Sequence, residues 1–191
     1  MSQRESGYAR KERDLYETPE WVTEAILPHL DKWRCDAVWE PAAGSGMMAR
    51  ILSRHFHRVY EWDICANNRP IVEADFLDFE RDDGEAPDGY EGIITNPPYE
   101  RATEFCEQAL RLTEKAGGMV AMLLRTDFDH AKSRAHLFRD CPAFQKKLVL
   151  MRRICWFVEA NGKPKASPSF NHAWYLWDWK HNGPPTIGYG P

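Results

Sequence analysis

Hydrophobic and polar positions follow two periods along this chain, one of two residues and one of about 3.6 residues. Short apolar runs with the first period alternate with longer amphipathic segments with the second. The pattern predicts helices at 19–30, 45–54, 99–116 and 130–139, and strands at 37–41, 58–63, 71–74, 92–96, 119–125, 146–152 and 172–179. This alternation indicates an α/β fold with an open, mostly parallel sheet and helices on both faces. The last two strands have no helix between them and should pair antiparallel.

The predicted strand at 92–96 ends in Asn96-Pro97-Pro98-Tyr99. Two consecutive prolines lack the N–H groups that a sheet requires, so the backbone has to leave the sheet there. The side-chain oxygen of Asn96 and the carbonyl of Pro97 then offer two hydrogen-bond acceptors, which suit a planar –NH2 group. Tyr99 offers a flat face on which a conjugated ring can stack. Taken alone, the same tetrapeptide is also ordinary turn sequence.

A second predicted strand runs into a glycine-rich turn that contains Gly44 and Gly46. Glycine permits a tight turn and lets a ligand approach the backbone closely. The turn also fits the G-x-G-x-x-[GA] pattern of dinucleotide-binding dehydrogenases. However, Glu40 and Pro41 precede the glycines, and a carboxylate at this position suits the ammonium group of a ligand and would repel a pyrophosphate.

Asp63 ends the next predicted strand, about twenty residues after the glycines. A carboxylate there can accept hydrogen bonds from both hydroxyls of a ribose, and Ile64 can cover the face of an adenine. Alternation along the strand is expected to place Glu61 on the side of the strand opposite to Asp63, so Asp63 is the preferred ribose ligand.

These motifs, in this order, resemble those of the S-adenosylmethionine-dependent amino-methyltransferases, which methylate exocyclic nitrogens of adenine or cytosine. The resemblance covers residues 16–179, nearly the whole chain. It implies a class I fold: a Rossmann-like sheet of seven strands, mostly parallel with an antiparallel last strand. It also implies S-adenosyl-L-methionine as the cofactor, with its methionine moiety held by the glycine turn.

Two further stretches resemble motifs of this family. Asp75-Phe76 resembles the third motif, in which the Asp accepts from the adenine amine and the aromatic residue packs on the ring. Tyr16, Thr18 and Pro19 resemble the N-terminal motif of DNA adenine methyltransferases, although Thr-Pro-Glu is equally an ordinary helix start. The residues assigned to the cofactor are Tyr16, Thr18, Pro19, Glu40, Pro41, Gly44, Gly46, Asp63, Ile64, Asp75, Phe76 and Asn96.

The resemblance assigns catalysis to Asn96, Pro97 and Tyr99. In the implied mechanism the target base leaves its stack and lies on Tyr99, while its amine binds Asn96 and the Pro97 carbonyl. The family's late loop places an aromatic ring on the far face of the base, and Phe170 is chosen for this role because it comes just before the last predicted strand. Trp156 and Phe157 are equally compatible with the core. The residues assigned to the substrate are Pro98, Tyr99, Lys163, Lys165 and Phe170.

Charge is unevenly distributed, although the net charge is only −4. Residues 73–91 hold nine acidic residues and one Arg, whereas residues 130–165 hold nine Lys or Arg and two acidic residues. The basic segment could follow a phosphate backbone, or it could be the basic surface of a protein that binds no nucleic acid.

At 191 residues the chain predicts one domain at 15–182, between a flexible N-terminus at 1–14 and an irregular C-terminal tail at 183–191. No apolar run is long enough to span a membrane, and the polar N-terminus does not resemble a signal peptide. The five cysteines form no C-x-x-C pair and the seven histidines have no ligand spacing. We therefore expect a cytoplasmic protein with reduced thiols and without a bound metal.

Together the residues and the resemblance predict an enzyme that methylates an exocyclic amine, with N6 of adenine in DNA as the preferred target. An RNA adenine, DNA N4-cytosine or protein-glutamine methyltransferase would use the same tetrapeptide. A cofactor-binding subunit of a larger complex is the alternative from a different class. Because the chain has no separate target-recognition domain, specificity would lie in a loop or come from a partner, and homodimerisation stays open.

Overall fold

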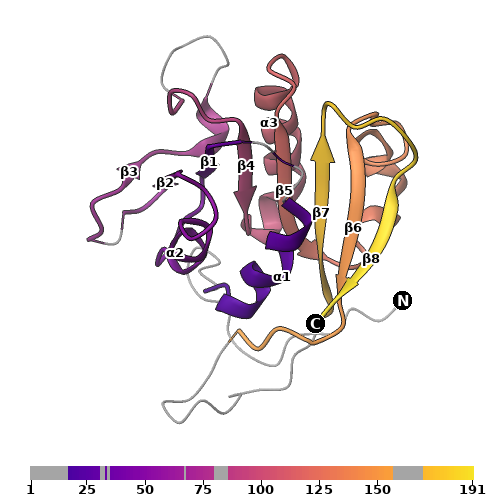
Figure 1. Cartoon of the computed structure of the whole chain (residues 1–191), viewed down its shortest axis with the longest axis horizontal. Coiled ribbons are helices and arrows are strands. Elements are labelled where there is room, and N and C mark those ends of the chain that lie inside the picture. The colour runs from indigo at the N-terminus through magenta and orange to yellow at the C-terminus, as the bar shows by residue number, and fades with distance from the viewer. Residues whose placement is uncertain (1–16, 31–32, 34, 67, 80–85, 157–169) are drawn as a thin grey trace.

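The computed structural model describes residues 17–30, 33, 35–66, 68–79, 86–156 and 170–191 (Figure 1). The strands are β1 (Ala37–Glu40), β2 (Arg58–Asp63), β3 (Val72–Glu73), β4 (Gly92–Thr95), β5 (Met119–Arg125), β6 (Phe144–Leu150), β7 (His172–Asp178) and β8 (Thr186–Gly190). The α-helices are α1 (Glu20–Leu30), α2 (Met47–Leu52) and α3 (Ala102–Glu114). Short 3₁₀ segments lie at Phe76–Asp78, Tyr99–Arg101, Phe128–His130 and Lys132–Leu137.

The strands form one sheet in the order β3-β2-β1-β4-β5-β7-β6-β8. Strands β1 to β5 pair with one another in parallel, and β7 is antiparallel to both β5 and β6. The predicted fold class is therefore confirmed: a mostly parallel Rossmann-like methyltransferase sheet with an antiparallel β6–β7 pair. Strands β1 to β5 all end at the same edge of the sheet, which is where open α/β sheets bind their ligands.

Strand β8 extends the sheet to eight strands and corrects the prediction of an irregular tail at 183–191. It pairs in parallel with β6, with Gly188 beside Leu148 and Gly190 beside Leu150. A Cβ atom added at either glycine would lie 3.4 Å from the neighbouring leucine side chain. Glycine is depleted in strands, so the local composition indicated a tail, but backbone pairing with β6 determines the structure here.

The helix predicted at 130–139 is replaced by two 3₁₀ segments, Phe128–His130 and Lys132–Leu137. Tertiary contacts compete with the regular helical pattern in this part of the chain. The Arg134 side chain donates to the carbonyl of Phe128 at 2.6 Å, and the Trp177 indole N–H donates to the carbonyl of Leu137 at 2.6 Å. These carbonyls are therefore satisfied by side chains.

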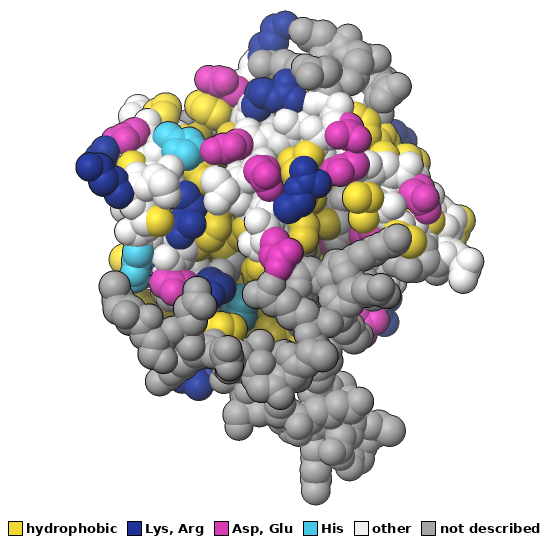
Figure 2. All heavy atoms as spheres, turned by 180° about the vertical axis from the view of Figure 1, so that it is seen from behind, with side chains coloured by type: hydrophobic (Ala, Val, Ile, Leu, Met, Phe, Trp, Pro, Cys, Tyr) yellow, Lys and Arg dark blue, Asp and Glu magenta, His cyan; other side chains and the backbone are white. Residues whose placement is uncertain are grey.

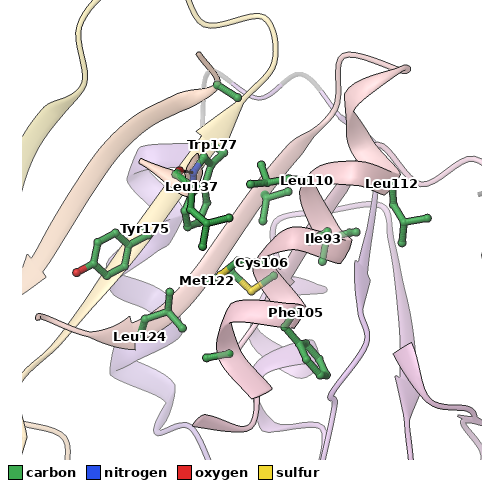
Figure 3. Close-up of a cluster of buried hydrophobic side chains, with 14 of the residues drawn as sticks. Ile93, Phe105, Cys106, Leu110, Leu112, Met122, Leu124, Leu137, Tyr175 and Trp177 are labelled. Carbon is green, nitrogen blue, oxygen red and sulfur yellow. Dashed lines mark hydrogen bonds between the residues drawn. The ribbon is translucent and has the colours of Figure 1, made fainter. Parts of the chain in front are cut away.

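Helices cover both faces of the sheet, with α1 and α2 on one face and α3 on the other (Figure 1). Alternation along β5 sends Val120, Met122 and Leu124 towards α3, and Ala121 and Leu123 towards α1 and α2. Figure 3 shows the cluster on the α3 side. Within the part of the chain that is described, no helix is long and apolar enough to cross a membrane.

Trp39 of β1 is the central side chain beneath the candidate site. Its ring is fully buried and contacts Trp62, Phe76, Phe79 and Tyr90 edge-on, with centroid distances from 5.0 to 5.5 Å. These partners come from β2, from the segment that follows β3 and from the loop before β4. The Trp39 ring therefore packs against all three segments that lie beside the candidate site.

We expect Trp39→Ala to lower the free energy of unfolding by about 3–5 kcal/mol, because the substitution leaves a large cavity among these four rings. Urea unfolding followed by circular dichroism measures the change. Tyr189→Ala is the matched control: Tyr189 is exposed on β8, and its loss should change the free energy of unfolding by no more than about 0.5 kcal/mol. Equal effects of the two substitutions would contradict the central role of Trp39.

Candidate active site

The turn after β1 is built on two glycines with left-handed backbone conformations. Gly44 has a φ of 52° and Gly46 a φ of 79°, a region that residues with a Cβ atom rarely adopt. The Gly46 N–H donates to the carbonyl of Ala43 at 2.7 Å, and its own carbonyl accepts from the Arg50 N–H in α2 at 3.0 Å. The predicted tight turn is thus present, and it leads directly into α2.

Glu40, the last residue of β1, has a side chain that is only 2% exposed. Burial raises the pKa of this carboxyl well above its usual value, and the negative charge of Glu61 raises it further. Its Oε2 atom has no hydrogen-bond partner among the described residues. A buried carboxyl group with an unused oxygen is suited to a cationic group of a ligand.

Asp63, the last residue of β2, holds the glycine turn in place. One carboxylate oxygen accepts from the Gly44 N–H at 2.8 Å and the other accepts from the Cys65 N–H at 2.9 Å. Each oxygen retains a further lone pair, so binding of a ribose diol by Asp63 stays a prediction. The structure adds a role that the sequence did not indicate, since Asp63 links the turn after β1 to the end of β2.

Glu61 lies on the same side of β2 as Asp63, which corrects the placement expected from the sequence. Val59 packs in the core cluster with α1 and α2, whereas Tyr60 and Trp62 pack in the cluster with α3. Odd-numbered positions of β2 therefore share the face that carries the glycine turn. Glu61 is a second candidate ligand that we missed, and the two-residue period alone was sufficient to find it.

Arg69, in the loop after β2, lies across the glycine turn. Its Nη1 donates to the carbonyl of Gly44 at 3.1 Å, and its Nη2 forms an ion pair with Glu61. A Cβ atom added at Gly46 would overlap the guanidinium group. The positive charge of Arg69 also lowers the pKa of Glu40, opposing the effect of burial. An arginine of the chain itself thus places a cation among the acidic residues of the turn.

The predicted adenine ligands lie in two different environments. Ile64 is exposed (55%) just beyond β2, where its side chain is accessible to a ligand. Phe76 is 2% exposed and packs between the rings of Trp39 and Phe105, at 5.2 and 5.0 Å. Asp75 accepts from the Leu77 N–H at 2.9 Å and forms an ion pair with Arg101 at 3.2 Å. Phe76 is therefore a core residue in this structure, and adenine binding by Asp75 and Phe76 stays a prediction.

Asn96 follows β4 directly and contacts a residue far away in the sequence. Its side-chain nitrogen donates to the hydroxyl of buried Thr18 at 3.1 Å. Thr18 and Pro19 immediately precede α1, so the N-terminal turn lies against the tetrapeptide. The assignment of these two residues to the cofactor stays a prediction. With the amide nitrogen turned towards Thr18, the Asn96 side-chain oxygen points away from it. Tyr16 lies outside the described residues.

Tyr99 belongs to a group of three rings. Its hydroxyl lies 3.1 Å from Nε2 of His172, the first residue of β7. Trp156 packs edge-on against both rings, with centroids 6.2 Å from Tyr99 and 5.2 Å from His172. The sequence did not indicate His172 as a site residue, and Trp156 was equally compatible with the core. No local signal indicates this group, because its members are far apart in the sequence.

Phe170, the aromatic residue chosen for the far face of the base, lies beneath Arg125. The Arg125 guanidinium carbon is 4.0 Å from the centroid of the Phe170 ring, a cation–π contact at the end of β5. The Trp156 ring packs against Tyr99, so Trp156 is a second candidate for the aromatic residue beside the base. Lys163 and Lys165 lie outside the described residues, so their phosphate contacts stay predictions.

Two basic side chains of the segment 130–165 are paired with acidic residues. Lys147 is largely buried and pairs with Asp129 at 2.8 Å, and Arg139 pairs with Asp140 at 2.7 Å. Figure 2 shows basic and acidic side chains interspersed on the face opposite to that of Figure 1. The described residues also contain no group of three His, Cys, Asp or Glu side chains placed to bind a metal.

No protein-family model and no curated protein matches the sequence. The structure is similar to that of a candidate RNA methyltransferase from Pyrococcus horikoshii, with a TM-score of 0.63 and 13% identity over 92% of this chain and 93% of the other. The 23S rRNA methyltransferase ErmE matches with a TM-score of 0.53 and 15% identity, over 90% of this chain and 71% of the other.

A modification subunit of a candidate type I restriction enzyme from Vibrio vulnificus YJ016 matches with a TM-score of 0.58 and 14% identity over 91% of this chain. The chain covers 46% of that subunit, just under half of its length. At these identities the similarity concerns the fold. The chain therefore has the class I methyltransferase fold, with the glycine turn and the tetrapeptide at the edge where its parallel strands end.

The raised pKa of Glu40 predicts a specific dependence of stability on pH. The folded protein holds this proton more tightly than the unfolded chain, whose value is about 4.5. The stability that Glu40 contributes is therefore complete below that value and is lost as the pH rises through the native pKa. Glu40→Gln removes the titration, so its free energy of unfolding should fall less than that of the wild type between about pH 5 and about pH 8.

Urea unfolding at both pH values measures this difference. The control is Glu104→Gln in α3, because Glu104 is largely exposed and lies on the opposite face of the sheet. The control should keep the pH dependence of the wild type. If Glu40→Gln also keeps it, the native pKa of Glu40 is not raised.

Proposed function

We propose that this protein transfers a methyl group from S-adenosyl-L-methionine to an exocyclic amine, with adenine N6 in DNA as the preferred target. The observation that carries the proposal is the position of Asn96-Pro97-Pro98-Tyr99. The tetrapeptide follows β4, the neighbour of β1 in a methyltransferase fold, and Asn96 is oriented by Thr18. The fold alone supports many reactions, so the argument rests on these residues.

The residues around the glycine turn fit the proposed cofactor. The buried Glu40 carboxyl has an oxygen without a hydrogen-bond partner among the described residues, which suits the α-ammonium group of the methionine moiety. Gly44 and Gly46 allow that moiety to approach the backbone. Glu61 and Asp63 bring two carboxylates to the end of β2, where the ribose hydroxyls require acceptors. Bound S-adenosyl-L-methionine would supply an electrophilic methyl group on a sulfonium.

The residues of the tetrapeptide would prepare the target nitrogen for attack. The side-chain oxygen of Asn96 and the Pro97 carbonyl accept hydrogen bonds from the target amine, which draws its lone pair out of conjugation with the ring. Tyr99 holds the ring by stacking. The amine would attack the methyl carbon while the methyl–sulfur bond breaks with its electron pair going to sulfur, and the methylated nitrogen would release one proton to solvent. Positioning and electrostatics therefore account for catalysis, and no general base is required.

The chemistry beside the tetrapeptide favours a nucleobase over a protein side chain. Tyr99 and Trp156 provide aromatic surface, and Arg125 stacks on Phe170 close by at the end of β5. Aromatic rings with an arginine at the rim are typical of sites for unstacked bases, because the rings stack on the base and the guanidinium pairs with phosphate. This combination supports a nucleic-acid substrate. The preference for DNA rests on the resemblance of the motifs.

Incubation of the protein with tritiated S-adenosyl-L-methionine and separate pools of DNA, RNA and protein tests the proposal. We expect label in DNA, recovered as N6-methyladenine after digestion. Label in RNA, in N4-methylcytosine or in protein glutamine would keep the methyltransferase and change its substrate. Label in no pool, with the cofactor bound, would favour a binding subunit that depends on a partner.

Asn96→Ala should lower the rate of methyl transfer by about 100-fold or more, because it removes an acceptor for the target amine. The affinity for S-adenosylhomocysteine, measured by calorimetry, should change little. Asn182→Ala is the matched control, since Asn182 is exposed in the loop before β8. If Asn96→Ala keeps more than about a tenth of the wild-type rate, the catalytic assignment is wrong.

Arg69→Ala should tighten the binding of S-adenosylhomocysteine by about threefold to tenfold. Arg69 holds Glu61 and the Gly44 carbonyl, and these contacts have to be broken if the ligand takes their place, at a cost typical of a partly exposed ion pair. Arg54→Ala provides the control, because Arg54 pairs with Glu24 between α1 and α2. Weaker binding by Arg69→Ala would mean that Arg69 contacts the ligand itself.

A further inference from the structure

His172 is buried where three segments of the chain meet. It begins β7 and lies opposite Arg125, the last residue of β5, in the antiparallel register. Its side chain is 2% exposed. A polar ring that is buried to this extent normally has a specific partner, because an unpaired polar group in the interior is costly.

The partner of His172 is the hydroxyl of Tyr99, 73 residues away in the sequence, at 3.1 Å from Nε2. A neutral imidazole has one donor and one acceptor nitrogen, and a tyrosine hydroxyl can both donate and accept. The pair is therefore joined by a hydrogen bond in either tautomer. The two ring planes are inclined at 37° with centroids 5.7 Å apart, so the rings are also in contact along their sides.

Trp156 completes the group as a third ring. It stands at 70° to Tyr99 and at 84° to His172. Such edge-on contacts are the favourable geometry for aromatic pairs and add to the energy of burial. Tyr99 is thus held at its hydroxyl by His172 and along its side by Trp156, which limits rotation about both of its side-chain torsions.

We propose that His172 is a positioning residue, which together with Trp156 fixes the plane of the Tyr99 ring on which the target base stacks. The inference rests on the proposed function and extends it to residues outside the tetrapeptide. The orientation of a stacked base determines where its amine lies relative to Asn96, so freedom of the ring reduces the fraction of bound base that can react. Loss of His172 should lower kcat more than it raises KM.

Burial makes this contact independent of pH over the physiological range. Burial and the positive charge of Arg125 lower the pKa of His172 to about 4, while Asp127 acts in the opposite direction. Tyr99 faces the same ring. The imidazole is neutral near pH 7, so it acts as a fixed hydrogen-bond partner. The ratio of kcat between His172→Gln and the wild type should be constant from about pH 6 to about pH 9.

A double-mutant cycle with Tyr99→Phe and His172→Ala tests the proposal. Each substitution breaks the same hydrogen bond, so each should lower kcat by about fivefold to tenfold, and the double variant should be no slower than His172→Ala alone. His172→Gln places an amide group near the position of Nε2 and should recover most of the activity. S-adenosylhomocysteine affinity should be the same in all variants. His136→Ala, which removes an exposed histidine paired with Glu107, is the control and should leave kcat unchanged.

The same cycle is measured on urea unfolding, which needs no activity and also shows that the variants fold. Coupling in unfolding together with coupling in kcat supports the proposal. Coupling in unfolding with independent effects on kcat would make His172 a structural residue and overturn it. A rate that falls with an inflection near pH 6.5 only when His172 is present would also overturn it, since the imidazole would then titrate. The cycle can show coupling in unfolding while the wild-type protein methylates neither DNA, RNA nor protein. That result would contradict the proposed function itself.

Discussion

Parallel pairing of β1 with β2 on one side and with β4 on the other is the constraint on which the site depends. The register sets Glu40 beside Glu61 and Trp39 beside Ile93, three residues before Asn96. Parallel strands end at a common edge, so the pairing alone brings two acidic side chains and the tetrapeptide to one place. The fully buried ring of Trp39 supports that edge from below through its contacts with β2 and with the segments beside β3 and β4.

Three acidic side chains lie at this edge of the sheet, and each has a different environment. The two carboxylate oxygens of Asp63 accept hydrogen bonds from the Gly44 N–H in the turn and from the Cys65 N–H just after β2. Glu61 pairs with Arg69. For Glu40 burial outweighs the opposing effects of Arg69 and of a backbone hydrogen bond from Ala49, and it favours the neutral form of the carboxyl. A ligand that carries a positive group would favour the ionised form of Glu40, and one that also displaces Arg69 would replace one cation with another. In the proposed function these carboxylates would favour a cationic ligand over a pyrophosphate.

The sequence predicted those parts of the fold and site that depend on local signals. Glycines at 44 and 46, two prolines after a strand and the alternation of strands with helices each have a local physical cause. The two-residue period of a strand places Glu61 on the same face as Asp63, so the expected placement on the opposite face was an error in applying that period. Other features depend on contacts between distant segments: β8 exists because β6 offers an edge, and the pairing of His172 with Tyr99 spans 73 residues. No propensity or short motif records such contacts, since tertiary pairing decides them.

The reversal of β7 explains why residues so late in the chain reach the site. In a sheet of parallel strands only residues after each strand lie at the ligand-binding edge. Because β7 is antiparallel to β5, its first residue lies at that edge, and His172 pairs with Arg125 there. The parallel half of the sheet thus supplies Glu40, Glu61 and the glycine turn, and the antiparallel strand supplies the partner of Tyr99. In the proposed function the parallel half therefore holds the cofactor and carries the tetrapeptide, and β7 adds the residue that positions Tyr99 for the target.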